Sequence, residues 1–152
     1  MRTPSAIAGS AVFFILAPGI VAGLVPWMLT GWRGPPVAPG YRLIGMLLVL
    51  AGLVVLVDAI ARFALVAPTE RLVIGGAYRF VRNPMYVAVL SILVGQALLF
   101  AEWRLAAYAG FVVAFVRHYE EPTLARRYGV EYEAYRRAVP GWLPRLTPWR
   151  GE

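Results

Sequence analysis

Two polar clusters interrupt an otherwise apolar chain, and their residue types suit the binding of a small charged molecule. The first cluster runs from Gly75 to Tyr86, and the second is the pair Glu120 and Glu121 followed by Pro122. Each flanks a long apolar run. An unpaired polar group in hydrocarbon costs on the order of several kcal/mol, so such clusters are typical of a site rather than of a lipid-facing surface. We expect the two clusters to meet and form one site.

The chemistry of the first cluster centres on a helix start. Proline disfavours helical geometry in the residue before it and fits the first helical position, so Asn83 followed by Pro84 predicts a helix that begins here, with Asn83 as its N-cap. The helix dipole and Arg82 would together favour an anion such as a carboxylate. A helix start that only contacts lipid headgroups is the competing interpretation.

The second cluster contains a helix-breaking residue beside its two acids. Pro122 cannot donate to the carbonyl of His118, so the helix is expected to kink next to Glu120 and Glu121 and to turn their carboxylates inward. Acids solvated at an ordinary helix end are the alternative. His118 has no carboxylate or cysteine set at ligand spacing, so no metal site is predicted.

An aromatic face follows the second cluster. Tyr128, Tyr132 and Tyr135 recur at spacings of four and three residues, with Arg127 and Arg136 beside them. One face of a helix would carry these rings, which could stack on a flat ring or lie against lipid. The spacing alone leaves both possibilities open.

The composition indicates that the solvent of this single domain is a bilayer. The 152 residues are 60% hydrophobic, with a mean hydropathy of +0.65 and no cysteine. A disulfide, a thiolate metal site and a cysteine nucleophile are therefore excluded. All 15 basic residues are arginines, and they flank the apolar runs, where anionic headgroups attract them. We expect membrane lipids, and no nucleic acid, as partners.

The elements that must position these clusters are four apolar runs. An all-α integral membrane protein is predicted, with transmembrane helices at about 11–30, 43–65, 85–101 and 103–119 and a cytosolic tail over 120–152. The tail is read as two short helices split by Gly129 and ending before Pro140. Asp58 and Arg62, four residues apart, are interpreted as an ion pair rather than as part of the site.

Arginine placement predicts the orientation. In the four-helix arrangement only Arg33, Arg42 and Arg104 lie on one side, and the other twelve arginines lie on the opposite side. The positive-inside rule then places both termini and both polar clusters in the cytoplasm. We expect an integral protein of a bacterial inner membrane.

Taken together, the clusters resemble the isoprenylcysteine carboxyl methyltransferase family, which includes bacterial members and the related phospholipid methyltransferases. The residues that carry the resemblance are Gly76, Tyr78, Arg82, Asn83, Pro84 and Tyr86, then Glu120, Glu121, Leu124, Gly129, Tyr132 and Tyr135. Many family members have histidine where this chain has Asn83. Asparagine can hydrogen-bond but cannot carry a proton, so an acid/base role of that histidine does not transfer.

The resemblance implies a bound S-adenosylmethionine at the cytosolic ends of the third and fourth helices, enclosed by the tail, and a lipophilic substrate entering from the bilayer. The residues assigned to the cofactor are Gly76, Tyr78, Arg82, Asn83, Pro84, Tyr86, Glu120, Glu121 and Tyr132. Arg136 or Arg127 would orient a carboxylate acceptor, and a glutamate such as Glu121 would take the proton of an amine acceptor. Methyl transfer by direct displacement needs in-line positioning and exclusion of water.

Two other functions are considered. A membrane reductase using a nicotinamide cofactor is suggested by sterol reductases, which look similar in the C-terminal region, although 152 residues provide few helices for that architecture. A non-enzymatic four-helix scaffold or transporter subunit would use its arginines only to contact anionic lipid. It would tolerate substitutions in both clusters.

Overall fold

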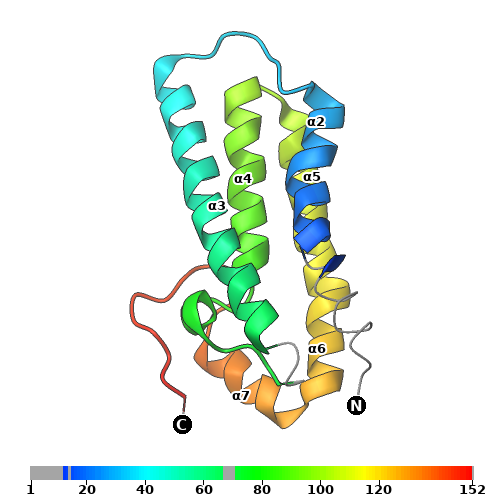
Figure 1. Cartoon of the computed structure of the whole chain (residues 1–152), viewed down its shortest axis with the longest axis vertical. Coiled ribbons are helices and arrows are strands. Elements are labelled where there is room, and N and C mark those ends of the chain that lie inside the picture. The colour runs from blue at the N-terminus through cyan, green and yellow to red at the C-terminus, as the bar shows by residue number, and fades with distance from the viewer. Residues whose placement is uncertain (1–11, 14, 67–70, 152) are drawn as a thin grey trace.

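The computed structural model describes residues 12–13, 15–66 and 71–151, and this part of the chain is helical throughout its regular structure (Figure 1). The elements are a helix over Ile15–Thr30, which includes η1 (Ile20–Leu24) and α2 (Val25–Thr30), then α3 (Pro39–Val66), η3 (Gly76–Arg79), α4 (Pro84–Phe100), α5 (Trp103–Phe115), η4 (Val116–Glu120), α6 (Glu121–Tyr128) and α7 (Val130–Ala138). The predicted all-α fold is confirmed.

The long helices stand side by side, with connections at both ends (Figure 1). The link between α2 and α3 and the turn between α4 and α5 lie at one end of the bundle. The turn η3, the helices α6 and α7 and the C-terminal segment gather at the other end, which we call the tail end. The start of α4 lies at this tail end, so the bundle brings both polar clusters to the same place.

Small residues let α3 and α4 pack closely. A Cβ atom on Gly45 would lie 2.8 Å from the backbone oxygen of Gly95, and one on Gly95 would lie 2.7 Å from that of Gly45. Two turns nearer the tail end, a Cβ on Gly52 would lie 2.8 Å from the backbone oxygen of Ala88. Close backbone approach through small residues is a common way for membrane helices to associate. The contact fixes α4, which carries the first cluster at its start.

A side chain from α4 completes the hydrogen bonding of the first helix. Pro26 has no N–H to offer the carbonyl of Ala22, four residues earlier. The Nε2 atom of Gln96 donates to that carbonyl at 2.8 Å, and Gln96 is buried. A buried acceptor without a partner is costly, so this amide holds the first helix against α4. The structure has a widened π turn, η1, that ends two residues before Pro26.

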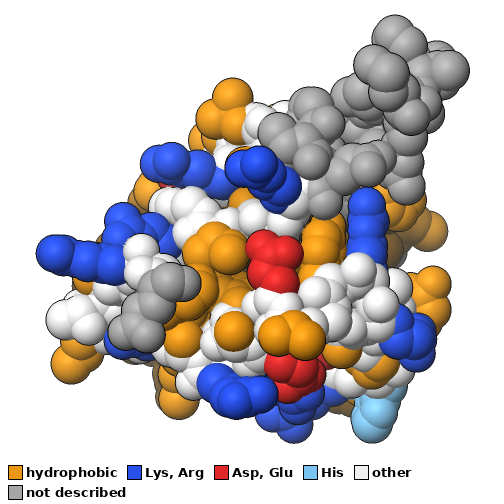
Figure 2. Space-filling view, turned by 90° about the horizontal axis from the view of Figure 1, so that it is seen from below, with side chains coloured by type: hydrophobic (Ala, Val, Ile, Leu, Met, Phe, Trp, Pro, Cys, Tyr) orange, Lys and Arg blue, Asp and Glu red, His pale blue; other side chains and the backbone are white. Residues whose placement is uncertain are grey.

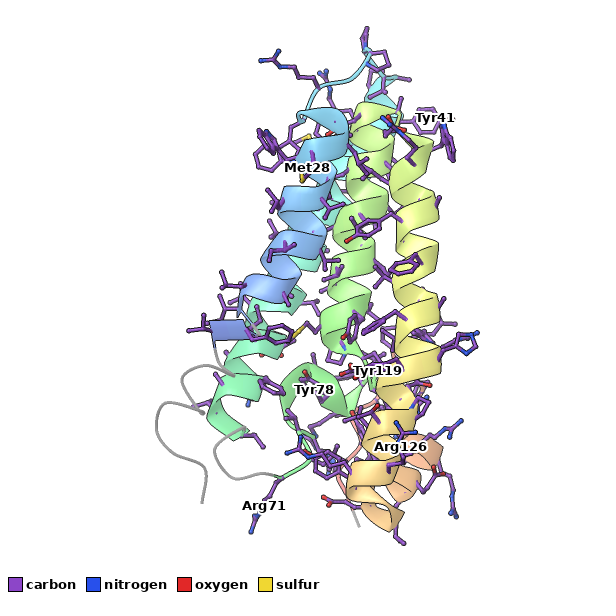
Figure 3. All side chains as sticks on the ribbon, turned by 90° about the vertical axis from the view of Figure 1, so that its right-hand side faces the viewer. Met28, Tyr41, Arg71, Tyr78, Tyr119 and Arg126 are labelled. Atoms are coloured by element: carbon purple, nitrogen blue, oxygen red, sulfur yellow. The ribbon has the colours of Figure 1, made fainter. Side chains whose placement is uncertain are left out.

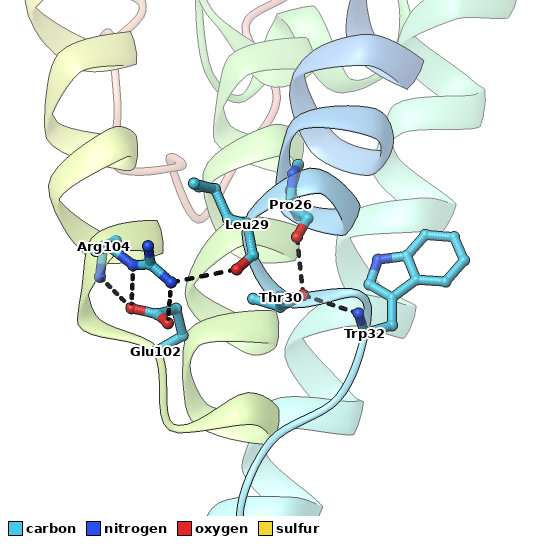
Figure 4. A network of polar contacts seen from close by, with 6 residues as sticks. All are labelled: Pro26, Leu29, Thr30, Trp32, Glu102 and Arg104. Atoms are coloured by element: carbon cyan, nitrogen blue, oxygen red, sulfur yellow. Dashed lines mark hydrogen bonds and ion pairs between the residues drawn. The ribbon is translucent and has the colours of Figure 1, made fainter.

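The turn between α4 and α5 is closed by an ion pair (Figure 4). Glu102 occupies the N-cap of α5 and accepts hydrogen bonds from the backbone N–H of Arg104 at 3.2 Å and from its guanidinium at 2.8 and 2.9 Å. These bonds lower the pKa of Glu102 to about 2. Arg104 also donates to the carbonyl of Leu29 at 3.2 Å. The predicted break between the third and fourth helices lies at this turn.

One described helix, α3, is long and apolar enough to cross a membrane on its own. Its outward side carries exposed apolar residues such as Leu50, Val54 and Val57, which suits contact with lipid. The helices over Ile15–Thr30 and Pro84–Phe100 are apolar but shorter. Four spanning helices are therefore not confirmed by helix length.

The tail folds as the sequence predicts. Helices α6 and α7 meet at Gly129, whose φ of +52° favours glycine, and α7 ends at Ala138, before Pro140. The expected kink at Pro122 takes the form of the π turn η4, which leads directly into α6. Tyr132 and Tyr135 are each only 2% exposed, so they pack inside the protein rather than against lipid.

Candidate functional site

The two polar clusters meet at the tail end of the bundle. The Nδ2 atom of Asn83 donates to Oε1 of Glu121 at 3.1 Å, and the Arg82 guanidinium lies 3.7 Å from the same oxygen. The Asn83 side chain is buried, and the Arg82 and Glu121 side chains are only 11% and 14% exposed. Charge-assisted contacts of this kind are stronger when water is excluded. The start of α4 and the start of α6 are thereby fixed to each other.

The contact extends to α7 and to the C-terminal segment. Arg82 donates from Nη1 to the hydroxyl of Tyr132 at 3.5 Å and from its backbone N–H to the carbonyl of Pro140 at 2.8 Å. Asn83 donates to the carbonyl of Gly141 at 3.2 Å. We call Arg82, Asn83, Glu121, Tyr132 and Gly141 the polar junction. It joins the start of α4 to the start of α6, to α7 and to the C-terminal segment.

Two features of the junction depend on local chemistry. Pro84 begins α4, as predicted, and Asn83 holds the N-cap position. Its side chain does not cap the helix, however, because the amide is used for Glu121 and Gly141. A Cβ atom on Gly141 would lie 2.8 Å from Nη2 of Arg82, so the guanidinium occupies the space that a side chain would need.

The turn η3 is held by a residue that sequence reasoning left outside the site. Asp58 and Arg62 form the predicted ion pair, at 3.5 Å, but Oδ2 of Asp58 also accepts from the backbone N–H of Ala77 at 3.1 Å. Gly76 has a φ of +56°, and a Cβ there would lie 2.6 Å from Nε of Arg62. Asp58 thus positions the turn that carries Tyr78. The i, i+4 spacing of Asp58 and Arg62 could not predict this second bond, because Ala77 lies in another element.

Tyr78 faces the interior from this turn (Figure 3). Its carbonyl accepts from the hydroxyl of Tyr135 at 2.6 Å, which ties the turn to α7. Burial raises the pKa of the Tyr78 hydroxyl, and the carboxylates of Glu120 and Asp58 add to this. The hydroxyl is therefore protonated at neutral pH, and it can serve as a hydrogen-bond donor.

A cavity of about 600 Å³ lies beside the polar junction. Its polar end is lined by Tyr78, Arg82, Asn83, Pro84, Tyr86, Glu120, Tyr132 and Tyr135. Its other walls are apolar side chains from the long helices, among them Val21, Val89, Phe111 and Phe115. One cavity therefore joins a polar end to an apolar chamber between helices.

The structure separates the two adjacent glutamates. Glu120 lines the cavity, whereas the Glu121 carboxylate turns to Asn83 and Arg82. Successive helical residues point about 100° apart, so neighbours on one helix commonly have different surroundings. Burial raises the pKa of Glu120, and a hydrogen bond with Tyr86 opposes part of this rise. Glu120 is the carboxylate that a ligand in the cavity would meet.

One donor at the cavity lacks a partner. The Nε atom of Arg82 is buried and has no hydrogen-bond partner among the described residues, whereas Nη1 donates to the Tyr132 hydroxyl and Nη2 lies 3.7 Å from the Glu121 carboxylate. A buried guanidinium N–H without an acceptor is costly. Arg82 also lines the cavity, so its guanidinium offers a positive charge to an anionic or carbonyl ligand there.

Besides Glu121, three of the predicted site residues lie outside the cavity lining. Gly76 lies at the start of the turn η3, and Arg127 has its guanidinium 5.3 Å from the centre of the Tyr128 ring. Arg136 pairs with Glu133 at 3.6 Å, with both side chains about half exposed. None of the three lines the cavity. Their assigned roles stay predictions.

Comparison with known families shows to which family the chain belongs. The family model described as phospholipid methyltransferase matches residues 41–131, which is more than half of the chain. The chain belongs to the phospholipid methyltransferase family. The match includes both polar clusters, and the resemblance found in the sequence is confirmed. A comparison with curated proteins and one with solved structures gave no match. The phospholipid methyltransferase family and the apolar α3 together indicate a membrane methyltransferase.

Proposed function

We propose that this phospholipid methyltransferase family member transfers a methyl group from S-adenosylmethionine to a lipophilic acceptor held in the membrane. The observation that supports the proposal most strongly is the single cavity that joins the polar junction to an apolar chamber between the long helices. A direct displacement needs both reactants in one water-excluding space. The family assignment favours this function over the nicotinamide reductase and the non-enzymatic scaffold.

The residues at the polar end suit this cofactor. The cavity volume of about 600 Å³ lies in the range of small-molecule sites. The Arg82 guanidinium would pair with the cofactor carboxylate, and the Tyr78 and Tyr132 rings offer flat faces for adenine. When bound, S-adenosylmethionine would supply a methyl group on a positively charged sulfur.

Glu120 and Glu121 have different roles in this proposal. Glu121 neutralises Arg82 and holds Asn83, so it positions the cofactor-binding residues. Glu120 faces the cavity and would accept a hydrogen bond from the cofactor or take the proton of an amine acceptor. A carboxylate acceptor would instead require Arg127 or Arg136 to approach the cavity. The carboxylate, amine and thiol classes of acceptor are separated by product analysis.

The apolar chamber would hold the alkyl part of the acceptor. Phe111 and Phe115 from α5, Val89 from α4 and Val21 from the first helix line it, so it is bounded by helices that we propose to span the bilayer. Four spanning segments, with the tail end in the cytoplasm of a bacterial inner membrane, fit the arginine distribution. The link between α2 and α3, which contains Arg33, and the starts of α3 and α5, which contain Arg42 and Arg104, lie at the opposite end of the bundle. A lipophilic acceptor would reach the chamber directly from the bilayer.

Methyl incorporation tests this function. The protein in lipid nanodiscs is incubated with S-adenosylmethionine labelled in its methyl group and a membrane lipid extract, and the products are identified by mass spectrometry. We expect a labelled lipophilic product, and we expect Glu120→Gln to lower its rate of formation. A folded protein that labels no component of the extract, and whose fluorescence responds to NADPH, would favour the reductase instead.

A further inference from the structure

The segment over residues 140–150, which we call the strap, is bonded along one edge to the loop of the first cluster. The backbone N–H of Arg145 donates to the carbonyl of Phe80 at 2.9 Å, and that of Trp149 donates to the carbonyl of Arg79 at 2.9 Å. The Nε atom of Arg79 donates a hydrogen bond to the carbonyl of Trp149 at 2.7 Å. With the bonds of Pro140 and Gly141 to the junction, the strap is fixed in place although it has no regular secondary structure.

Two leucines of the strap are exposed. Leu146 is 100% exposed and Leu143 is 80% exposed. The strap, orange to red in Figure 1, bends outward beside the last turns of α3, the helix that is long enough to cross a membrane. Isolated exposed leucines are common on soluble surfaces. Here both project from an ordered segment next to the end of a spanning helix, where the lipid headgroups would lie.

The charge of this region matches an anionic surface. The strap carries Arg145 and Arg150 and no acidic residue, and Arg137 precedes it on α7. Arg145 is oriented by a bond from its Nη1 to the carbonyl of Ala138 at 2.8 Å. Viewed from the tail end, arginine side chains surround much of the rim (Figure 2). Arginine near an anionic leaflet strengthens binding about fivefold per residue, and exposed leucines add apolar insertion.

We propose that the strap binds the anionic surface of the cytosolic leaflet, with Leu143 and Leu146 inserted at the headgroup boundary and with Arg145 and Arg150 on lipid phosphates. The inserted side and the bonded side belong to the same short segment. Lipid binding therefore holds the strap against residues 79–83, of which Arg82 and Asn83 line the cavity. Anionic lipid would keep the wall of the methyltransferase cavity closed.

A single labelled cysteine tests this proposal, because the chain has none of its own. Leu146→Cys carries an environment-sensitive fluorophore, and Val130→Cys, at a position that is 87% exposed at the same end but outside the strap, is the matched control. Full-length protein is placed in nanodiscs of phosphatidylcholine alone or with phosphatidylglycerol. We expect the label at position 146, but not at 130, to emit at shorter wavelength and to be quenched by spin-labelled lipid when phosphatidylglycerol is present.

A second measurement separates lipid binding from misfolding and from catalysis. Hydrogen exchange is followed in peptides that cover residues 79–83 and 140–149, without any cofactor. We expect phosphatidylglycerol to slow this exchange several-fold in the wild type and much less in the double variant Arg145→Gln, Arg150→Gln, whose α3 and α4 exchange should not change. Equal signals from positions 146 and 130, or contact at 146 that neither phosphatidylglycerol nor the double variant alters, would overturn the proposal. Failure of methyl transfer would leave these readouts untouched.

Discussion

Asn83 and Glu121 are 38 residues apart in the chain, and their side chains are joined by a hydrogen bond of 3.1 Å. This bond connects the first turn of α4 to the first turn of α6, so the two polar clusters share one buried junction. It also decides which of two neighbouring acids is free to meet a ligand, because Glu121 is engaged and Glu120 faces the cavity. Asparagine suits this position, since its amide can donate to the carboxylate and to the Gly141 carbonyl together.

Replacing Asn83 with leucine should therefore destabilise the tail end. The substitution removes both donated bonds and leaves the carbonyl of Gly141 without its partner, at a cost of about 1–3 kcal/mol in the free energy of unfolding. Chemical unfolding in detergent would measure the loss. Glu121→Gln should cost a similar amount because Arg82 then loses its counter-charge. Full stability in both variants would show that the junction does not hold the clusters together.

Glu120 should make stability depend on pH in a predictable direction. Burial raises the pKa of Glu120 above its ordinary value of 4.5, although a hydrogen bond with Tyr86 opposes this. The folded state then holds the proton more tightly than the unfolded state, so this group lowers the free energy of unfolding as the pH rises from 4.5. The free energy of unfolding, measured as the pH rises from 4.5, should decline less in Glu120→Gln than in the wild type. Parallel curves would show that Glu120 is solvated.

The bond between Gln96 and the Ala22 carbonyl should be important for attachment of the first helix. Gln96→Leu leaves a buried carbonyl that Pro26 cannot satisfy, and we expect a loss of about 1–3 kcal/mol. Ser91→Ala is the matched control on the same helix. Its hydroxyl donates at 2.7 Å to Leu48, a residue in the interior of α3, whose carbonyl keeps a helical partner. In thermal unfolding, the midpoint temperature of Gln96→Leu should be well below that of Ser91→Ala.

The turn η3 should not tolerate a side chain at Gly76. The φ of +56° is unfavourable for alanine by about 1–2 kcal/mol, and the new Cβ would crowd Arg62 and Asp58. Displacing Asp58 would release the N–H of Ala77, and Tyr78 would lose its position in the cavity wall. Gly110→Ala on α5 has open space and ordinary helical geometry, so it should be neutral or slightly stabilising. Cofactor affinity and unfolding of both variants would be compared.

Much of the helical framework could be predicted from sequence. The apolar runs, the helix start at Pro84, the break between helices at Glu102 and the split at Gly129 depend on local chemistry, and the structure confirms each. Helix lengths were predicted less well, because run length does not show where α5 passes into η4. Gln96 was detectable in principle. It is a lone amide inside one apolar run, and Pro26 in another apolar run leaves a carbonyl that needs a donor.

The division of roles within the site could not be predicted. Glu120 and Glu121 are the same residue type at adjacent positions, and only their partners from α4 distinguish them. In the same way, the bond of Asp58 to Ala77 joins residues 19 apart and depends on how η3 packs on α3. Sequence spacing reports neighbours on one helix, whereas these contacts are made between elements.

In the proposed function, Arg82 binds S-adenosylmethionine at the polar end of the cavity. Calorimetric titration of the protein in nanodiscs with the demethylated product S-adenosylhomocysteine tests it most directly, with Arg82→Lys as the comparison. Lysine keeps the charge but removes the Nε donor and the planar guanidinium, so we expect saturable binding by the wild type and affinity about 10–100-fold weaker in the variant. A folded wild-type protein that shows no saturable binding, or equal affinity in both proteins, would contradict the claim.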